Sequence, residues 1–313
     1  MKALFLLAFG GPRSLDEVEL LLTRLFKGRK PSSEQLERVK ERYRLIGGCS
    51  PLSEITSGQA EALEKELNSR GHAFKSYVGM RYGYPLIEET LKQIIRDGFK
   101  EIVALPMTPF QSRASTGAYI EEVNQANEKL GGVISISFLK QWHCHPLYIE
   151  ALREKIEEGL KEFEPASRKG VHLLFTAHSL PKSAVENDPY VKEIEESVCA
   201  VLQRVGPRPW HIAYQSKGGG PEEWIGPDVE KVLEDLGSQE VKEVLLVPVG
   251  FLTDHIEILY DVDIVFQKKA DFLGMVLKRT RSLNTSERFI KALASAVEEQ
   301  LGGFEDSRVQ GTE

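Results

Sequence analysis

One histidine and a group of acidic residues stand where the sequence could support metal or proton chemistry. His178 closes a short apolar run, and Glu257 and Asp261 lie in a segment that follows another such run. An imidazole titrates near neutral pH and can take up a proton or bind a metal ion. Carboxylate oxygens bind divalent cations. These residue types therefore predict a divalent-cation site next to a group that accepts protons, with a purely structural histidine as the alternative.

The acidic residues are expected on one helix. Thr253 or Asp254 is a suitable N-cap, and residues 254–267 have helical periodicity. On an α-helix Asp254, Glu257 and Asp261 fall at positions i, i+3 and i+7, so they share one face. Two interpretations stay open: a solvated acidic face near a helix N-terminus, and a row of oxygen ligands for a cation.

Two further segments are weaker candidates. His143, Cys144 and His145 resemble a metal clip, but the sequence offers no second pair of ligands, and a loop between a strand and a helix explains them equally well. Residues 216–221 are glycine-rich but lack the spacing of a phosphate-binding or dinucleotide-binding loop. We interpret them as a turn before Trp224, whose ring could line the site of an aromatic ligand.

The elements that would position these residues alternate along the chain. Apolar runs typical of buried strands occupy residues 3–9, 73–78, 102–106, 133–138, 171–176, 211–214, 244–247 and 272–277. Segments with helical spacing, such as 53–69, 85–96, 146–162 and 190–204, separate them. This alternation predicts an α/β protein with parallel sheets flanked by helices.

The two halves of the chain resemble each other in order. ALFLLAFGGP from residue 3 parallels VHLLFTAHSLP from residue 171, and FKEIVALP from residue 99 parallels VKEVLLVP from residue 241. We therefore expect two similar α/β lobes, 1–145 and 146–313, with a cleft between them and the last helix packed back on the first lobe. The first half carries an insertion at about 13–50. We expect a lid there, because it follows a strand at the sheet edge where such proteins bind ligands.

Composition excludes several classes of protein. The 313 residues are 41% hydrophobic and 28% charged, with a net charge of −7, which is typical of a globular domain. The sequence has no long basic block of the kind that predicts nucleic-acid binding. No apolar run approaches the roughly 20 residues of a membrane span. The number of cysteines is odd, and the three, Cys49, Cys144 and Cys199, lie far apart in sequence. This argues against disulfides, a structural zinc site or an iron–sulfur cluster. We expect a cytoplasmic protein.

Five motifs, read together, carry a family resemblance. They are LAFGGP at 7–12, IGGCSPL at 46–52, AHSLP at 177–181, YQSK at 214–217 and PVGFLTDHIEILY at 248–260. In this order, and continuing through Leu283, Asn284 and the last helix, the chain resembles the ferrochelatase family, most closely its short bacterial members. The resemblance implies a lyase of haem biosynthesis that inserts Fe²⁺ into a porphyrin. It also implies two Rossmann-like lobes with the porphyrin in the cleft, Fe²⁺ as substrate and no permanently bound cofactor.

The resemblance also assigns roles to residues. It implies that the catalytic residues His178 and Glu257 face each other across the macrocycle, and that Asp261 joins them in binding the metal on its path to the porphyrin. Positions that match porphyrin or propionate contacts are Arg42, Tyr43, Ser50 and Tyr119, with Trp224 as part of the wall. Which of His178 and Glu257 handles iron, and which handles protons, stays open.

Two departures from the family pattern concern the substrate. Phe9 stands where many soluble bacterial members have a tyrosine that can bind product iron, and Phe9 cannot. Phe26 replaces an arginine of the propionate-binding wall, with Lys27 and Arg29 as nearby substitutes. Coproporphyrin III and protoporphyrin IX therefore both stay open as substrates.

Two rival functions share this architecture. One is a cobalt chelatase of sirohydrochlorin, which the Asp-His-Ile-Glu segment at 254–257 disfavours. The other is a non-catalytic porphyrin or haem carrier, which has no need of a base facing a carboxylate. The expected partners are a porphyrin, ferrous iron and a transient haem acceptor, and we expect a monomer.

Overall fold

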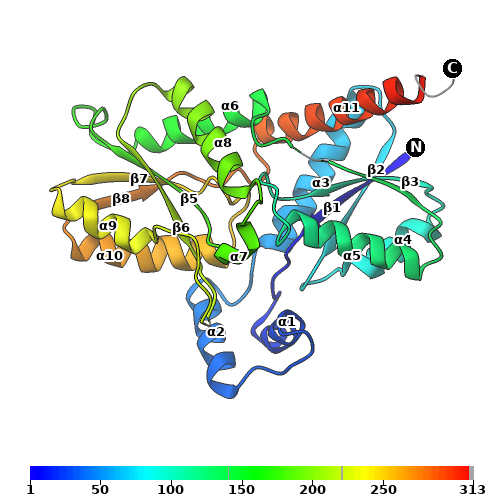
Figure 1. The fold of residues 1–313 in the computed structure, drawn as a ribbon, viewed down its shortest axis with the longest axis horizontal. Coiled ribbons are helices and arrows are strands. Elements are labelled where there is room, and N and C mark those ends of the chain that lie inside the picture. Colours follow the sequence, from blue (N-terminus) through cyan, green and yellow to red (C-terminus); the bar gives the residue numbers. More distant parts are fainter. Residues whose placement is uncertain (140, 220, 310–313) are drawn as a thin grey trace.

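Two parallel sheets of four strands form the two lobes. The computed structural model describes residues 1–139, 141–219 and 221–309, with side chains described through residue 302. The first sheet has the order β2-β1-β3-β4, and the second has the equivalent order β6-β5-β7-β8 (Figure 1). The strands are β1 (Lys2–Ala8), β2 (Phe74–Met80), β3 (Glu101–Pro106), β4 (Ser135–Phe138), β5 (His172–His178), β6 (Trp210–Gln215), β7 (Glu243–Val247) and β8 (Val276–Arg279). The matching strand orders confirm the prediction of two similar lobes.

Helices cover both sheets at most of the positions predicted from the apolar spacing. They are α3 (Leu52–Ser69), α4 (Ile87–Arg96), α5 (Thr116–Lys129), α6 (Pro146–Leu160), α7 (Lys182–Val185), α8 (Tyr190–Val205), α9 (Val229–Ser238), α10 (Gln267–Phe272) and α11 (Glu287–Val309). The predicted strand at 272–277 begins too early. Phe272 ends α10 and is 86% exposed, and Gly274 follows with a φ of 67°, which suits the end of a helix. Within the described part of the chain, no helix is both long and apolar enough to cross a bilayer.

The largest hydrophobic core is shared by the two lobes. It joins the inner faces of both sheets to α3, α6, α8 and α11. Leu63 and Leu67 of α3 and Leu293 and Val297 of α11 are fully buried in it, and each such side chain contributes about 1.5–3 kcal/mol. Because α11 contacts both α3 and α6, the last helix links one lobe to the other (Figure 1).

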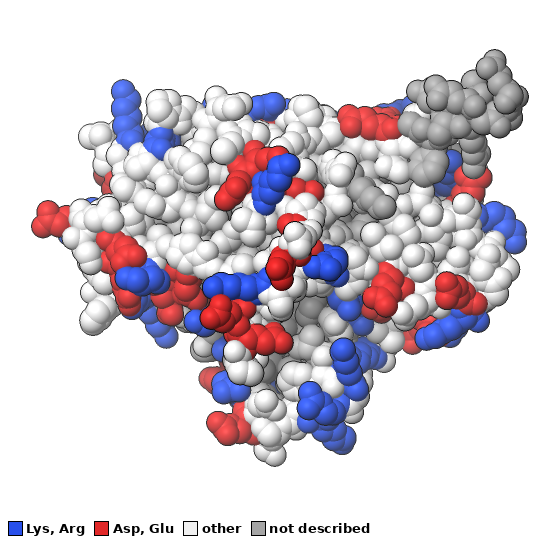
Figure 2. Space-filling view, viewed as in Figure 1, with Lys and Arg blue, Asp and Glu red and all other residues white. Residues whose placement is uncertain are grey.

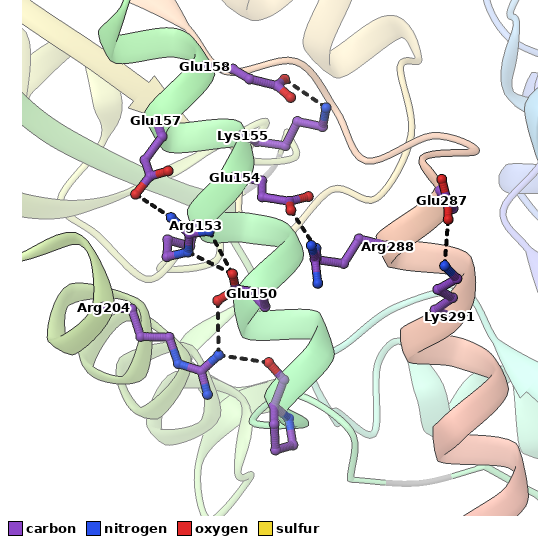
Figure 3. A network of polar contacts seen from close by, with 11 residues as sticks. Glu150, Arg153, Glu154, Lys155, Glu157, Glu158, Arg204, Glu287, Arg288 and Lys291 are labelled. Carbon is purple, nitrogen blue, oxygen red and sulfur yellow. Dashed lines mark hydrogen bonds and ion pairs between the residues drawn. The ribbon is translucent and has the colours of Figure 1, made fainter.

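Ion pairs on α6 orient the neighbouring helices (Figure 3). Arg288 of α11 donates to Glu154 at 2.5 Å. Arg204 of α8 pairs with Glu150 at 3.3 Å and donates to the carbonyl oxygen of Pro146 at 3.0 Å. Exposed pairs of this kind contribute only about 0–1 kcal/mol each, so they mainly set the relative positions of the helices.

The insertion at 13–50 forms a small helical unit at the mouth of the cleft. It contains η1 (Leu15–Glu17), α1 (Val18–Leu25) and α2 (Ser33–Leu45), and α2 begins with a capping box between Ser32 and Gln35. Its core side chains Val18, Leu22 and Tyr43 pack against Ile256. The insertion therefore lies beside the segment that carries Glu257.

Candidate active site

A cleft with a volume of about 280 Å³ lies between the lobes. It lies at the carboxyl ends of β1 and β5, the edge at which open α/β sheets bind ligands. Six of the residues named from the sequence line it: Phe9, Tyr43, Ser50, Tyr119, His178 and Glu257. The cleft therefore brings together residues from the insertion and from both lobes.

His178 is the last residue of β5, and its ring is held in one orientation. Its Nδ1 lies in hydrogen-bond contact with the carbonyl oxygen of Ser179. Because a carbonyl can only accept, Nδ1 carries the proton and Nε2 is left for chemistry. Ser179 is itself fixed, since its backbone N–H donates to Gln215 at 2.7 Å and its hydroxyl donates to the carbonyl of Ile225 at 2.7 Å. The hydroxyl of Tyr190 donates to the carbonyl of His178 at 2.9 Å.

Gly250 lets the segment that carries Glu257 approach the end of β5. Its backbone N–H donates to the carbonyl of Thr176 at 3.1 Å. A Cβ atom at position 250 would lie 2.8 Å from Cβ of Ala177, closer than real side chains pack. Glycine is therefore required for this close approach of two backbones.

Glu257 begins a π-helix, η2 (Glu257–Phe266), instead of the predicted α-helix over 254–267. The hydrogen bonds of a π-helix run from i to i+5, and π-helical turns are frequent at functional sites. Glu257 is fixed at both backbone groups: its N–H donates to Nδ1 of His255 at 3.1 Å, and its carbonyl accepts from Gln215 at 2.8 Å. Asp261 follows within about one wide turn of the helix.

Asp254 does not share the face of Glu257 and Asp261, so that prediction was wrong. Asp254 precedes the helix, and its carboxylate accepts from Ser282 and Asn284, each at 2.8 Å. Arg279 lies 3.3 Å away. Asp254 therefore ties the start of η2 to the segment after β8, because three donors already surround its oxygens.

His178 and Glu257 form an ion pair, with Nε2 and Oε1 3.4 Å apart. Burial alone would lower the pKa of His178, but the nearby carboxylate of Glu257 outweighs burial and raises the pKa to about 9. Burial opposes ionisation of Glu257, yet the charge and hydrogen bond of His178 hold its pKa below the ordinary value. Both side chains are therefore charged at neutral pH.

Asp261 has a different environment. Burial raises its pKa to about 6, and the negative charge of Glu257 acts in the same direction, although the hydroxyl of Ser216 donates to it at 2.7 Å. A cation between Glu257 and Asp261 would relieve this repulsion. The pair of carboxylates is therefore suited to bind a divalent cation.

Four of the residues expected to bind the metal or the porphyrin do not line the cleft. Asp261 follows Glu257 on η2, and Arg42 places its guanidinium over the ring of Tyr260, 5.2 Å from the ring centroid. Trp224 packs against Gly218 and pairs with Pro181. Lys27 lines a separate hollow with Phe26 and Arg29. Figure 2 shows Lys and Arg side chains gathered over α1 and the loop that follows it.

The sequence interpretation missed several polar residues of the cleft wall, among them Arg81 and His255. The guanidinium of Arg81 lies 5.0 Å from the ring centroid of Tyr82 and 5.5 Å from that of Tyr119, and it pairs with Glu122 at 3.0 Å. The position of Arg81 directly after β2 was the available signal, since the carboxyl ends of the parallel strands face the cleft. Burial lowers the pKa of His255, so its ring is neutral and can accept from Glu257.

Comparisons with known proteins agree over nearly the full length. The ferrochelatase family model matches residues 1–301. Ferrochelatases of Deinococcus radiodurans and Geotalea daltonii are 38% and 40% identical over 295 and 318 residues, covering 93% and 96% of this chain and 93% and 98% of theirs. The coproporphyrin III ferrochelatase of a Geobacillus species is 36% identical over 298 residues, which cover 94% of this chain and 96% of the relative.

Solved structures of low sequence identity share the fold. SirB from Bacillus subtilis with Fe³⁺ superposes with a TM-score of 0.60 at 12% identity, covering 98% of both chains. CbiX, from siroheme biosynthesis in denitrifying bacteria, gives 0.57 at 9% identity and covers 96% of this chain and 99% of its own. At such identities the likeness concerns the two-lobed architecture alone.

Proposed function

The chain belongs to the ferrochelatase family, whose members insert ferrous iron into a porphyrin, and from this premise we propose that His178 and Glu257 perform the insertion in the cleft between the lobes. The supporting observation is their ion pair in the cleft, with Nε2 of His178 and Oε1 of Glu257 3.4 Å apart. Metal insertion needs a base for the pyrrole N–H protons and oxygen ligands for an ion that is losing water. An imidazole and two carboxylates supply both.

We propose that the porphyrin enters by separating this pair. A group in van der Waals contact with a flat ring lies about 3.5–4.0 Å from it, so groups on opposite faces are about 7 Å apart. The pair at 3.4 Å leaves no such gap, and the side chains must therefore part when the macrocycle binds between them. This separation couples substrate binding to a change in the protonation of His178.

The roles of the two residues follow from that separation. Once Glu257 moves away, His178 loses the charge that raises its pKa, while burial continues to lower it. We propose that the imidazolium then releases its Nε2 proton to solvent. The freed Nε2 accepts one pyrrole proton and passes it to solvent before it takes the second. Glu257 and Asp261 hold Fe²⁺ on the opposite face and release it to the pyrrole nitrogens as these become free.

Cationic side chains near the cleft are proposed to bind the porphyrin propionates. Arg81 lines the cleft, and Arg42 and Lys27 lie on the insertion beside it. Arg in particular forms strong paired hydrogen bonds with carboxylates. Phe9, Tyr43, Ser50 and Tyr119 are proposed to contact the macrocycle, with Phe9 the most exposed of them at 44%.

The decisive experiment is anaerobic Fe²⁺ insertion followed by absorbance, with coproporphyrin III and protoporphyrin IX offered separately. We expect turnover of at least one, and the faster substrate identifies the physiological porphyrin. Binding of both porphyrins without insertion would favour a carrier. Cobalt insertion into sirohydrochlorin in place of either reaction would favour a cobalt chelatase.

We propose a monomeric cytoplasmic enzyme that passes haem to a transient acceptor and carries no iron–sulfur cluster. The three free cysteines suit a reducing compartment. We further propose residues 1–145 and 146–313 as the two domains, with 13–50 as the lid.

A further inference from the structure

A histidine, a cysteine and a glutamate meet at the junction between the lobes, outside the cleft. His143 and Cys144 lie in the loop between β4 and α6, and Glu196 lies on α8. One ligand atom from each residue falls within 4.8 Å of the others, and Nε2 of His143 is 3.0 Å from Oε2 of Glu196. We propose that these three side chains bind a divalent transition-metal ion of borderline softness, such as Zn²⁺.

Glu196 provides the ligand that the 143–145 segment lacks in sequence. It follows His143 by 53 residues, so no local spacing reveals it. His145 is not available as a third ligand from the loop. Its Nδ1 accepts from the N–H of Leu147 at 3.2 Å as the N-cap of α6, and its Nε2 faces Glu299 at 3.2 Å.

The loop is already held against α8 on both sides of Cys144. The hydroxyl of Ser197 donates to the carbonyl of His143 at 2.7 Å. Arg204 donates to the carbonyl of Pro146 at 3.0 Å (Figure 3). Because the backbone is fixed before an ion arrives, binding costs little conformational entropy.

A buried carboxylate stands behind the histidine, where metal sites often place one. Nδ1 of His143 is buried and has no hydrogen-bond partner. Oε1 of Glu193 lies 3.7 Å from it, while Oε2 of Glu193 accepts from the N–H of Gln111 at 2.6 Å. When Nε2 of His143 binds a metal ion, Nδ1 must carry the proton, and this N–H can donate a hydrogen bond to Glu193. Such a carboxylate–histidine–metal arrangement orients the ring and makes it a better ligand.

The ligand types and the separations indicate which ion fits. Zn²⁺ binds Cys, His and carboxylate ligands at about 2.0–2.3 Å, so ligand atoms around a tetrahedral ion are about 3.3–3.8 Å apart. The side chains of Cys144 and Glu196 are exposed, so each can turn by the ~1 Å required, and water can complete the shell. A sulfur ligand disfavours Mg²⁺ and Ca²⁺. On binding, the thiol of Cys144 loses its proton to solvent.

Co²⁺ is the probe that separates this site from the cleft. A thiolate bound to Co²⁺ absorbs in the near ultraviolet, and no described residue of the cleft wall is a cysteine. We expect the band to appear when Co²⁺ is added to the full-length protein and to disappear when Zn²⁺ is added. It should persist in a His178→Ala background, because the cleft does not contribute to it.

Matched variants test each ligand. Cys144→Ser should abolish the band and Cys49→Ser should keep it. His143→Asn and Glu196→Gln should each weaken Zn²⁺ binding at least tenfold, whereas His145→Asn, which retains an N-cap side chain, should not. Circular dichroism without metal establishes that each variant is folded. A band that is absent from the wild type, or that survives in Cys144→Ser, would overturn the proposal.

Discussion

Glu257→Gln is expected to lower the pKa of His178 by about one pH unit. In the free enzyme, burial lowers this pKa, but the carboxylate of Glu257 with Oε1 3.4 Å from Nε2 raises it to about 9. A neutral amide at position 257 removes the charge and leaves the effect of burial. The imidazole should therefore titrate much closer to its ordinary value of 6.5.

The expected size follows from the geometry and from solvent screening. A pKa raised from 6.5 to about 9 corresponds to roughly 3 kcal/mol of preference for the charged imidazole. The side chain of His178 is 35% exposed, so water screens part of this interaction, and we expect ~1–2 kcal/mol. That range is a change of about 5- to 30-fold in the protonation equilibrium, which is about 0.7–1.5 pH units.

Nuclear magnetic resonance titration of the histidine Cε1–H signals measures this directly, with the signal of His178 assigned from its absence in His178→Gln. Glu196→Gln is the matched control, since that glutamate contacts His143 and should leave His178 unchanged. Identical titration of His178 in the wild type and in Glu257→Gln would refute the ion pair.

The same pair predicts how stability depends on pH. Because the pKa of His178 is raised on folding, its contribution is complete below pH 6.5 and is lost as pH rises through about 9. Because the pKa of Glu257 is lowered, its contribution is present above the ordinary value of 4.5 and is lost as pH falls below it. The free energy of unfolding, measured in urea, should therefore differ most between wild type and Glu257→Gln at about pH 5–7. The difference should shrink towards pH 10.

Three further changes probe the site and one probes the core. His178→Ala should reduce iron insertion by about 10²–10⁴-fold with an unchanged circular dichroism spectrum, and retained turnover would contradict its catalytic role. Phe9→Tyr should shift the absorption spectrum of bound haem, whereas an unchanged spectrum would mean that residue 9 does not face the iron. Because the pKa of Asp261 is about 6, the KM for Fe²⁺ should rise as pH falls below 6 in the wild type. In the Asp261→Asn variant the KM for Fe²⁺ should be high at every pH. A KM that depends on pH as it does in the wild type would exclude Asp261 from iron binding. Phe289 is fully buried and lies 6.2 Å from Trp142, centroid to centroid. Phe289→Ala should therefore cost about 3–5 kcal/mol in urea unfolding, and a cost below ~1 kcal/mol would mean that the interface between α11 and the core is loosely packed.

The sequence by itself determined the α/β class, the two similar lobes and most of the element boundaries. These properties are written locally: the spacing of apolar residues selects helix or strand, and glycine and proline mark the turns. Motif order was enough to single out His178 and Glu257. The carboxyl ends of strands, where parallel sheets bind ligands, also indicated where a cleft would lie.

Only the tertiary structure decided how distant residues meet. The segment 254–267 has the spacing of an α-helix, yet contacts with Gln215 and His255 accompany a π-helix from Glu257 onwards. Asp254 has the spacing of the acidic row, but the chain after β8 brings Ser282 and Asn284 close to it, and both donate to its oxygens.

Tertiary packing also decides the charge on His178 and the cluster around His143. A histidine has a pKa near 6.5 until folding sets a carboxylate beside it, and no spacing in the chain reports the 3.4 Å between Nε2 of His178 and Oε1 of Glu257. Glu196 is 53 residues from His143 in sequence, and packing of α8 against the loop before α6 makes them neighbours. Local preferences act over a few residues, whereas the electrostatics of a site depend on groups that only the packing of whole elements brings together.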